Sequence, residues 1–132
     1  MVNITENGEL MDIFYEEAQS LIDEMRGDLS TLGQGQETSQ DQSTVLRHLF
    51  RCVHIIKTSS ASVGLDDLNK VTEALERIFK MAGDERFAMT ADIISLLSES
   101  VDTCRKLLNG AEVVGHKELL DRLNSILQTP RG

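Results

Sequence analysis

The stretch "RCVHIIKTSSASVGLDDLNKVTEALERIFKMAG", residues 51–83, contains two amphipathic helical segments separated by a glycine. In its second half the apolar residues return every three or four positions and form one helical stripe, made of Leu68, Val71, Leu75, Ile78, Phe79 and Ala82. The separating residue is Gly64, and glycine in the left-handed conformation commonly ends a helix. We therefore predict a helix that stops near Val63 and a second that Asp66 caps and Gly83 ends.

The same spacing continues on both sides of this stretch and predicts five helices, at residues about 9–32, 44–63, 66–82, 90–109 and 115–128. The polar segment Gly33–Ser43 is expected to be a loop, with Ser43 or Thr44 capping the second helix and Thr90 the fourth. The predicted inner stripe of the first helix is Leu10, Ile13, Phe14, Ala18, Leu21, Ile22, Met25, Leu29 and Leu32. Short connections favour antiparallel packing. We expect one all-α domain, residues 1–132, built as an antiparallel up-and-down four-helix bundle with an additional C-terminal helix.

Composition agrees with a helical domain and excludes several classes of partner. The chain has 132 residues, 4% aromatic residues, no Trp and one Pro, a mixture that suits helix packing better than a sheet. A net charge of −9 argues against nucleic acid and against an anionic membrane surface as partners. There is no secretion signal and no 18-residue apolar run. A cytoplasmic protein is expected.

The two cysteines, Cys52 and Cys104, have neither CxxC nor CxxH spacing. We expect both to be small buried apolar residues in a reducing compartment, with no disulfide and no zinc site. The three histidines are not placed with carboxylates in the Glu-x-x-His pattern of metal-binding bundles. His48 and His116 are therefore interpreted as ordinary surface residues, and no metal site is expected.

His54 is predicted to point away from the core. At 100° per residue, the core stripe of the second helix is Val45, Leu49, Cys52, Ile56 and Val63, and His54 lies about 180° from Val45. Phe50 and Arg47 share that outer direction, and an exposed Phe beside an exposed His indicates a docking surface. The small residues Thr58, Ala61 and Ser62 leave the ring open to a large partner.

Such an exposed imidazole has a possible chemistry. A neutral imidazole can accept a phosphoryl group, and Lys57 at i+3 is within reach to stabilise the added charge. A carboxylate that accepts the Nδ1 proton would leave the Nε2 lone pair free. Glu76, at the edge of the next helix's stripe, is the better candidate, since Glu73 points further out. A surface His with a Lys at i+3 also occurs without function, so spacing leaves both interpretations open.

The segment Leu49–Phe79 resembles the histidine phosphotransfer (HPt) domain, in particular the N-terminal phosphotransfer domain of CheA-type chemotaxis kinases. The matching residues, in the order of the family motif, are Phe50, Arg51, His54, Lys57, Ser59, Ala61, Gly64, Leu65 and Glu76. The resemblance extends outward to "FYEEAQSLIDEMRGDLSTL" and "DERFAMTADIISLLSESVDTCRKLL". It therefore covers nearly the whole chain and implies the same bundle fold that the periodicity predicts.

The resemblance implies a phosphocarrier in two-component signal transduction, not an enzyme on its own. His54 would be the phospho-acceptor, Lys57 the charge stabiliser and Glu76 the orienting acceptor. Docking residues would be Phe50, Arg51, Thr58, Ala61 and Gly64. The partners would be a histidine kinase ATP-binding domain and a response-regulator receiver domain. ATP and Mg²⁺ belong to those partners, so no cofactor is expected here.

Two departures from the family pattern stand near His54. Thr58 replaces the usual Gly after the Lys and puts a β-branched side chain one turn from the ring, which is expected to slow transfer or narrow partner choice. Glu73 stands where kinases of the family often have a second His, and would add negative charge near His54. The alternative function is a helical adaptor that docks receiver or kinase domains without phosphotransfer. The sequence leaves open whether the natural chain continues beyond Gly132.

Overall fold

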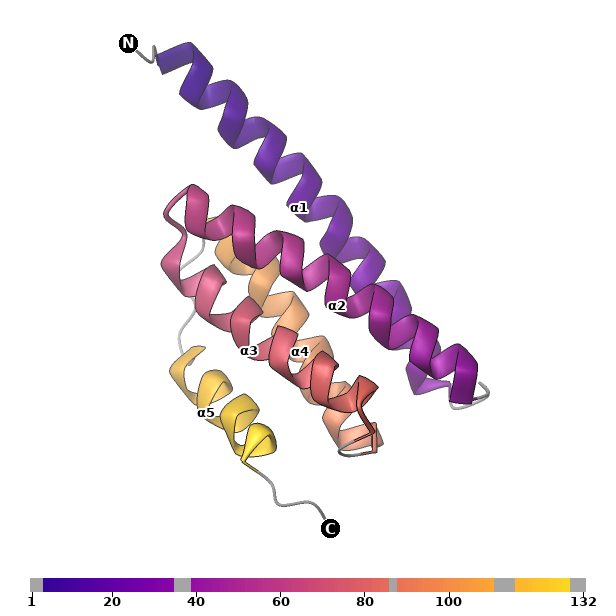
Figure 1. Ribbon diagram of the computed structural model, residues 1–132. Coiled ribbons are helices and arrows are strands. Elements are labelled where there is room, and N and C mark those ends of the chain that lie inside the picture. The colour runs from indigo at the N-terminus through magenta and orange to yellow at the C-terminus, as the bar shows by residue number, and fades with distance from the viewer. Residues whose placement is uncertain (1–3, 35–38, 86–87, 111–115, 129–132) are drawn as a thin grey trace.

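The computed structural model describes residues 4–34, 39–85, 88–110 and 116–128, and these form five helices (Figure 1). The helices are α1 Ile4–Gly33, α2 Ser39–Ser62, α3 Asp66–Gly83, α4 Ala91–Leu108 and α5 His116–Leu127. The all-α prediction is confirmed. None of the described helices is both long and apolar enough to cross a membrane.

The first four helices form a closed ring of contacts. α2 packs against α1 and α3, and α4 packs against the same two helices from the other side. α5 lies mainly against α3, with a smaller contact to α4 (Figure 1). The buried side chains form one cluster to which all five helices contribute, and its largest fully buried members include Phe79, Ile22, Met25, Leu49, Leu75, Leu97 and Leu123. This is the expected four-helix bundle with an additional C-terminal helix.

α1 is longer than predicted and part of its predicted stripe is exposed. A helix of 30 residues is about 45 Å long, whereas the 18 residues of α3 or α4 span about 27 Å. The N-terminal turns of α1 therefore extend past the other helices (Figure 1). Leu10 and Ile13 are 61% and 60% exposed, so their assignment to the core was wrong. The rest of the stripe is buried or half-buried, from Phe14 to Leu32.

α2 also begins earlier than predicted, at Ser39 instead of Ser43 or Thr44. Its first turns are polar and contain Asp41, whose charge suits the positive end of the helix dipole. A loop was predicted here because the segment has no apolar residues. A helical turn that faces solvent, however, does not need apolar side chains. Residues 35–38 of the predicted loop lie outside the described residues.

The junction between α2 and α3 has the predicted glycine stop but a different cap. Gly64 adopts φ +79°, and the amide of Leu65 donates to the carbonyl of Ser60 at 2.9 Å, which closes the last turn of α2. Because this closure brings the chain directly into α3, Leu65 occupies the N-cap position and no side chain caps the helix. Asp66, the predicted cap, is the first helical residue.

The other helix ends follow the sequence more closely. The Thr90 side chain accepts from the amide of Ile93 at 3.3 Å, so this predicted cap is confirmed. α4 ends at Leu108, with Asn109 as its C-cap and Gly110 following at φ +78°. At the end of α3, however, Gly83 is the last helical residue, and Glu85 adopts the left-handed conformation with φ 59°.

Candidate functional site

His54 lies on the outer face of α2, as its angular position predicts. Its side chain is 53% exposed. Phe50, Thr58 and Ala61 are one or two turns away on the same face; Phe50 is half-buried and the other two are exposed. The opposite face of α2 is the buried one and consists of Leu46, Leu49, Cys52, Val53, Ile56 and Ser60. Val45 and Val63, predicted for the core, are only half-buried, because the buried sector is rotated toward α3.

Glu76 of α3 connects His54 and Lys57. The Nδ1 atom of His54 donates a hydrogen bond to Oε2 of Glu76. Lys57 donates from Nζ to the other oxygen, Oε1, at 2.8 Å. A carboxylate only accepts, so Nδ1 carries the ring proton and the lone pair belongs to Nε2. No hydrogen bond involves this Nε2 among the residues that the structure describes.

The carboxylate of Glu76 is held in its charged form. Its side chain is only 15% exposed, and burial by itself would raise its pKa. The hydrogen bonds and positive charges of Lys57 and His54 outweigh burial and lower the pKa of Glu76 below its ordinary value. Glu76 is therefore an anion near neutral pH and a hydrogen-bond acceptor for both neighbours.

The backbone behind Lys57 is tied to α3. The carbonyl oxygen of Lys57 accepts from Nδ2 of Asn69 at 2.8 Å and from Oγ of the buried Ser60 at 2.9 Å. The first bond crosses from α3 to α2 and fixes the relative position of the two helices at the site. Sequence reasoning missed Asn69. Asn69 lies seven residues, or two helical turns, before Glu76 on the same face of α3, and this spacing could have identified it as part of the site.

Phe50 packs beside the imidazole. The two rings are nearly parallel, with an interplanar angle of 11° and centroids 6.1 Å apart. Phe50 also lines an open hollow of about 350 Å³ between the start of α2 and the end of α3, together with Ser43, Leu46, Arg47, Phe79, Lys80, Gly83 and Asp84. Its lining combines three apolar side chains with two basic ones and one acidic one, and it begins at Phe50, one helical turn from His54.

The remaining predicted docking residues of α2 and its C-terminal junction are all exposed. Thr58 is exposed, but its hydroxyl donates back to the carbonyl of His54 at 2.8 Å. Arg51, Ala61 and Gly64 are exposed.

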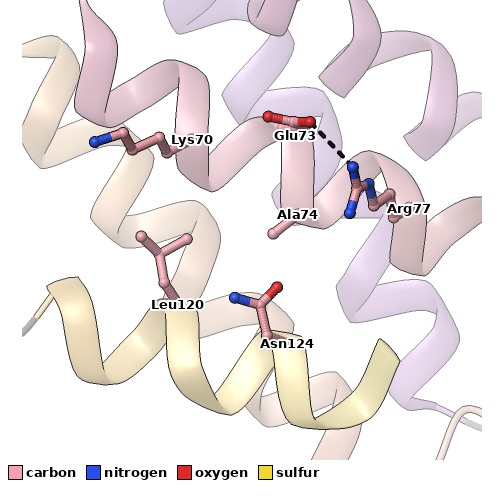
Figure 2. A pocket seen from close by; sticks show the side chains of 6 residues that line it. All are labelled: Lys70, Glu73, Ala74, Arg77, Leu120 and Asn124. Carbon is pink, nitrogen blue, oxygen red and sulfur yellow. Dashed lines mark hydrogen bonds and ion pairs between the residues drawn. The ribbon is translucent and has the colours of Figure 1, made fainter. Parts of the chain in front are cut away.

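Glu73 does not contact His54. It pairs with Arg77 at 3.3 Å and lines a hollow of about 250 Å³ between α3 and α5 (Figure 2). The other residues that line this hollow are Lys70, Ala74, Leu120 and Asn124. Its side chain is directed along α3 to Arg77, so the negative charge expected near His54 is paired with a cation of its own, and Glu76 is the carboxylate bonded to the ring.

The other two histidines are not ordinary surface residues. Nδ1 of His48 donates to Oδ2 of Asp28 on α1, and Nε2 lies 3.4 Å from Oε1 of Glu24. His116 lies 3.6 Å from Asp67 on α3 and its side chain is 22% exposed. Each imidazole connects two helices, which single-helix geometry does not reveal. Cys52 and Cys104 are buried free thiols, as predicted.

Comparison with known proteins defines the class of this molecule. Residues 9–128 match the model of the Hpt domain family, so the chain belongs to the histidine phosphotransfer domains. A solved structure, the phosphorylated P1 domain of CheA3 in complex with CheY6 from R. sphaeroides, superposes with a TM-score of 0.76 and 25% identity. The match covers 90% of this chain and 95% of that one.

The similar curated proteins are chemotaxis kinases. The chain is 32% identical over 103 residues to the chemotaxis protein CheA of Borreliella burgdorferi, which covers 78% of the chain. It is 29% identical over 100 residues to the sensor histidine kinase CheAY of Helicobacter pylori, covering 76% of the chain. It spans only about 12% of the length of either relative. The chain is thus a phosphocarrier domain that resembles the P1 domain of CheA.

Proposed function

We propose that His54 accepts a phosphoryl group from the ATP-binding domain of a CheA-type histidine kinase and passes it to an aspartate of a receiver domain. The observation that carries this proposal is the pairing of His54 Nδ1 with Glu76 in a side chain that is 53% exposed, with no hydrogen bond to Nε2 from the described residues. A fixed tautomer with an outward lone pair is the form of imidazole that acts as a nucleophile.

The two transfers balance without a cofactor in this domain. In the first, the Nε2 lone pair attacks the γ-phosphorus of ATP, and the bond to the β,γ-bridging oxygen breaks to release ADP. In the second, a carboxylate oxygen of the receiver attacks phosphorus, the P–N bond breaks, and its electrons return to Nε2. Nδ1 keeps its proton throughout, hydrogen-bonded to Glu76. ATP and Mg²⁺ are held by the partner domains, so this chain contributes exposure and orientation.

Lys57 has two roles in this proposal. Its ion pair keeps Glu76 charged and in place. Its ammonium group also adds positive charge next to a phosphoryl group on His54, which stabilises the anionic product.

The outer face of α2 supplies the docking surface for both partners. Phe50 and the hollow beside it offer apolar area next to the ring, and Ala61 is small enough for close approach. Arg51 and Gly64 form the edges of this face, and the Thr58 methyl group narrows it. The solved relative, a phosphorylated P1 domain in complex with CheY6, supports a CheY-like receiver as the acceptor.

The site and the relatives together favour a cytoplasmic chemotaxis phosphorelay. The reaction requires ATP and Mg²⁺, which are available in the cytoplasm, and two free thiols suit its reducing conditions. The alternative, an adaptor that docks the same partners but carries no phosphate, is consistent with the same surface.

Incubation with a CheA-type kinase lacking its own phosphotransfer domain, with radiolabelled ATP and Mg²⁺, separates the two functions. We expect a label that is acid-labile and base-stable in the wild type and in His116→Gln, and no label in His54→Gln. Unchanged circular dichroism of His54→Gln establishes that its fold is intact. Label that persists in His54→Gln, or a wild type that binds kinase without being labelled, contradicts phosphotransfer through His54.

A further inference from the structure

A second imidazole on α2 is held in the same way as His54 but faces a different environment. His48 donates its Nδ1 proton to Asp28 of α1, which leaves the lone pair on Nε2. The side chain of His54 is 53% exposed, and Lys57 shares the Glu76 carboxylate with it. At His48 the Nε2 atom instead faces the carboxylate of Glu24, at 3.4 Å, and the sulfur of Cys52, at 3.7 Å. The negative charge of Glu24 next to the Nε2 lone pair would repel a phosphate group. The carboxylate, the imidazole nitrogen and the sulfur are instead suitable ligands for a cation.

The spacing of these three atoms fits a metal ion. Glu24 O, His48 Nε2 and Cys52 Sγ all lie within 4.8 Å of one another. With zinc bonds of about 2.0–2.1 Å to nitrogen and oxygen and about 2.3 Å to sulfur, a tetrahedron separates N and O by about 3.4 Å and N and S by about 3.6 Å. The distances of 3.4 and 3.7 Å therefore already correspond to two edges of a zinc tetrahedron.

The helices present these donors on facing sides. His48 and Cys52 are at i and i+4 on α2, one turn apart on one face, and Glu24 and Asp28 have the same spacing on α1. Asp28 completes a carboxylate–histidine pair of the kind that orients metal-bound imidazoles and increases their basicity. Cys52 is 2% exposed, whereas the side chains of His48 and Glu24 are 42% and 49% exposed, so an ion can enter from the His48 and Glu24 side.

We propose that Glu24, His48 and Cys52 form a zinc site between α1 and α2, with Asp28 as the residue that orients His48 and water as the fourth ligand. Mixed N, O and S donors in tetrahedral geometry select Zn²⁺ over Mg²⁺ or Ca²⁺, which prefer oxygen. Binding releases the thiol proton of Cys52 to solvent, and the sulfur then bonds to the metal. The bound ion links α1 to α2 on the side of α2 away from His54.

Without metal, the surroundings of Cys52 favour its protonated thiol. Burial raises the pKa of the Cys52 thiol to about 11, and the carboxylates of Glu24 and Asp28 add to the effect. Arg51 opposes it. The metal-free thiol is thus protonated and is not poised as a nucleophile.

Zinc and cobalt titrations of the tag-free chain test the proposal. Zn²⁺ affinity is measured by competition with a chromophoric chelator, and Co²⁺ reports sulfur ligation through a sulfur-to-cobalt charge-transfer band. We expect one equivalent of zinc, a cobalt–sulfur band and a raised melting temperature for the wild type. Asp28→Asn is expected to weaken zinc binding about 10- to 100-fold. His48→Gln and Cys52→Ala are expected to weaken it further, and Cys52→Ala to abolish the band.

The chain offers matched controls for both ligand types. Cys104→Ala removes the other buried thiol, and His116→Gln and His54→Gln remove the other imidazoles that pair with carboxylates. All three controls are expected to bind zinc like the wild type. Equal zinc affinity in the wild type and in His48→Gln and Cys52→Ala, or a cobalt complex without the sulfur band, overturns the proposal. So does a wild type that binds no zinc. None of these zinc-binding results bears on the phosphorylation of His54, which is measured separately with kinase and ATP.

Discussion

Glu76 gives the surface imidazole its direction. One of its oxygens holds the His54 ring proton and the other holds Lys57, so a single carboxylate fixes the tautomer, the ring orientation and the position of a cation. The neighbouring Glu73 is of the same type and only three residues away, but it binds Arg77 instead. The two glutamates therefore form a natural pair for testing which carboxylate acts on His54.

Glu76→Gln is expected to slow phosphorylation of His54 by about 10- to 100-fold, because a hydrogen bond to a charged group is worth about 1.5–3 kcal/mol. The measurement is the initial rate of labelling by kinase and ATP. Glu73→Gln is the control and should keep the wild-type rate. Equal slowing in both variants would show that overall charge, not the contact with His54, controls the reaction.

The lowered pKa of Glu76 makes its contribution to stability dependent on pH. The pKa of Glu76 is lower in the folded protein than its unfolded value of 4.5. The charged carboxylate therefore stabilises the fold at pH values above 4.5. This stabilisation is lost as the pH falls through the folded pKa. We expect the difference in free energy of unfolding between wild type and Glu76→Gln to shrink in acid from its value at neutral pH. Denaturant titrations at pH 7 and below pH 4.5 measure it; a constant difference would contradict the pKa shift.

The α2–α3 hairpin is the element that assembles the site. Its short junction at Gly64 aligns the two helices, and the bond from Asn69 to the Lys57 carbonyl fixes them at the level of Glu76. A one-residue shift of α3 about its axis turns each side chain by about 100°, which would direct Glu76 away from His54. The geometry of the junction therefore controls how Glu76 meets His54, which lies nearly three turns before Gly64 on α2.

The same substitution at two glycines is expected to have opposite effects. Gly64→Ala places a side chain at φ +79° and should lower the free energy of unfolding by about 1–2 kcal/mol. Gly27 lies within α1, and a Cβ added there has open space around it, so Gly27→Ala should raise stability by roughly 0.5–1 kcal/mol. Urea denaturation of both variants measures the two values. Equal signs would contradict the assigned conformations.

In the whole molecule, the face that carries His54 and the helices that support the core are on different sides. The closed ring of α1 to α4 buries the core, and α5 covers the side of α3 that does not face α2. The outer face of α2 is left uncovered among the described residues, where His54 is exposed. Ion pairs such as Arg122–Glu99, at 3.1 Å between α5 and α4, lie at the surface and contribute little. The attachment of α5 is thus mainly apolar.

Leu123 tests this role of α5. Its side chain is fully buried, and Leu123→Ala is expected to lower the free energy of unfolding by about 2–4 kcal/mol. In the described part of the chain α5 does not contact α2, so labelling of His54 in the folded variant by kinase should keep its wild-type rate. Thermal unfolding and labelling measure the two effects. A stable variant with slow labelling would mean that α5 acts on the site and not on the core.

The periodicity of the chain was sufficient to predict five helices and the exposure of His54, because helical direction is a local property with a fixed angle per residue. The phosphotransfer function was implied only by the resemblance of the residues around His54 to the family motif. It also favoured Glu76 over Glu73, from their angles on α3. The solvated first turns of α2, the exposed Leu10 and the protruding end of α1 did not follow, since burial depends on what lies opposite. The grouping of Glu24 and Asp28 around His48 and Cys52 did not follow either. Which residues of α1 meet which residues of α2 depends on the register and crossing angle of the two helices. These arise from the packing of the complete core and cannot be inferred from the sequence pattern of either helix alone.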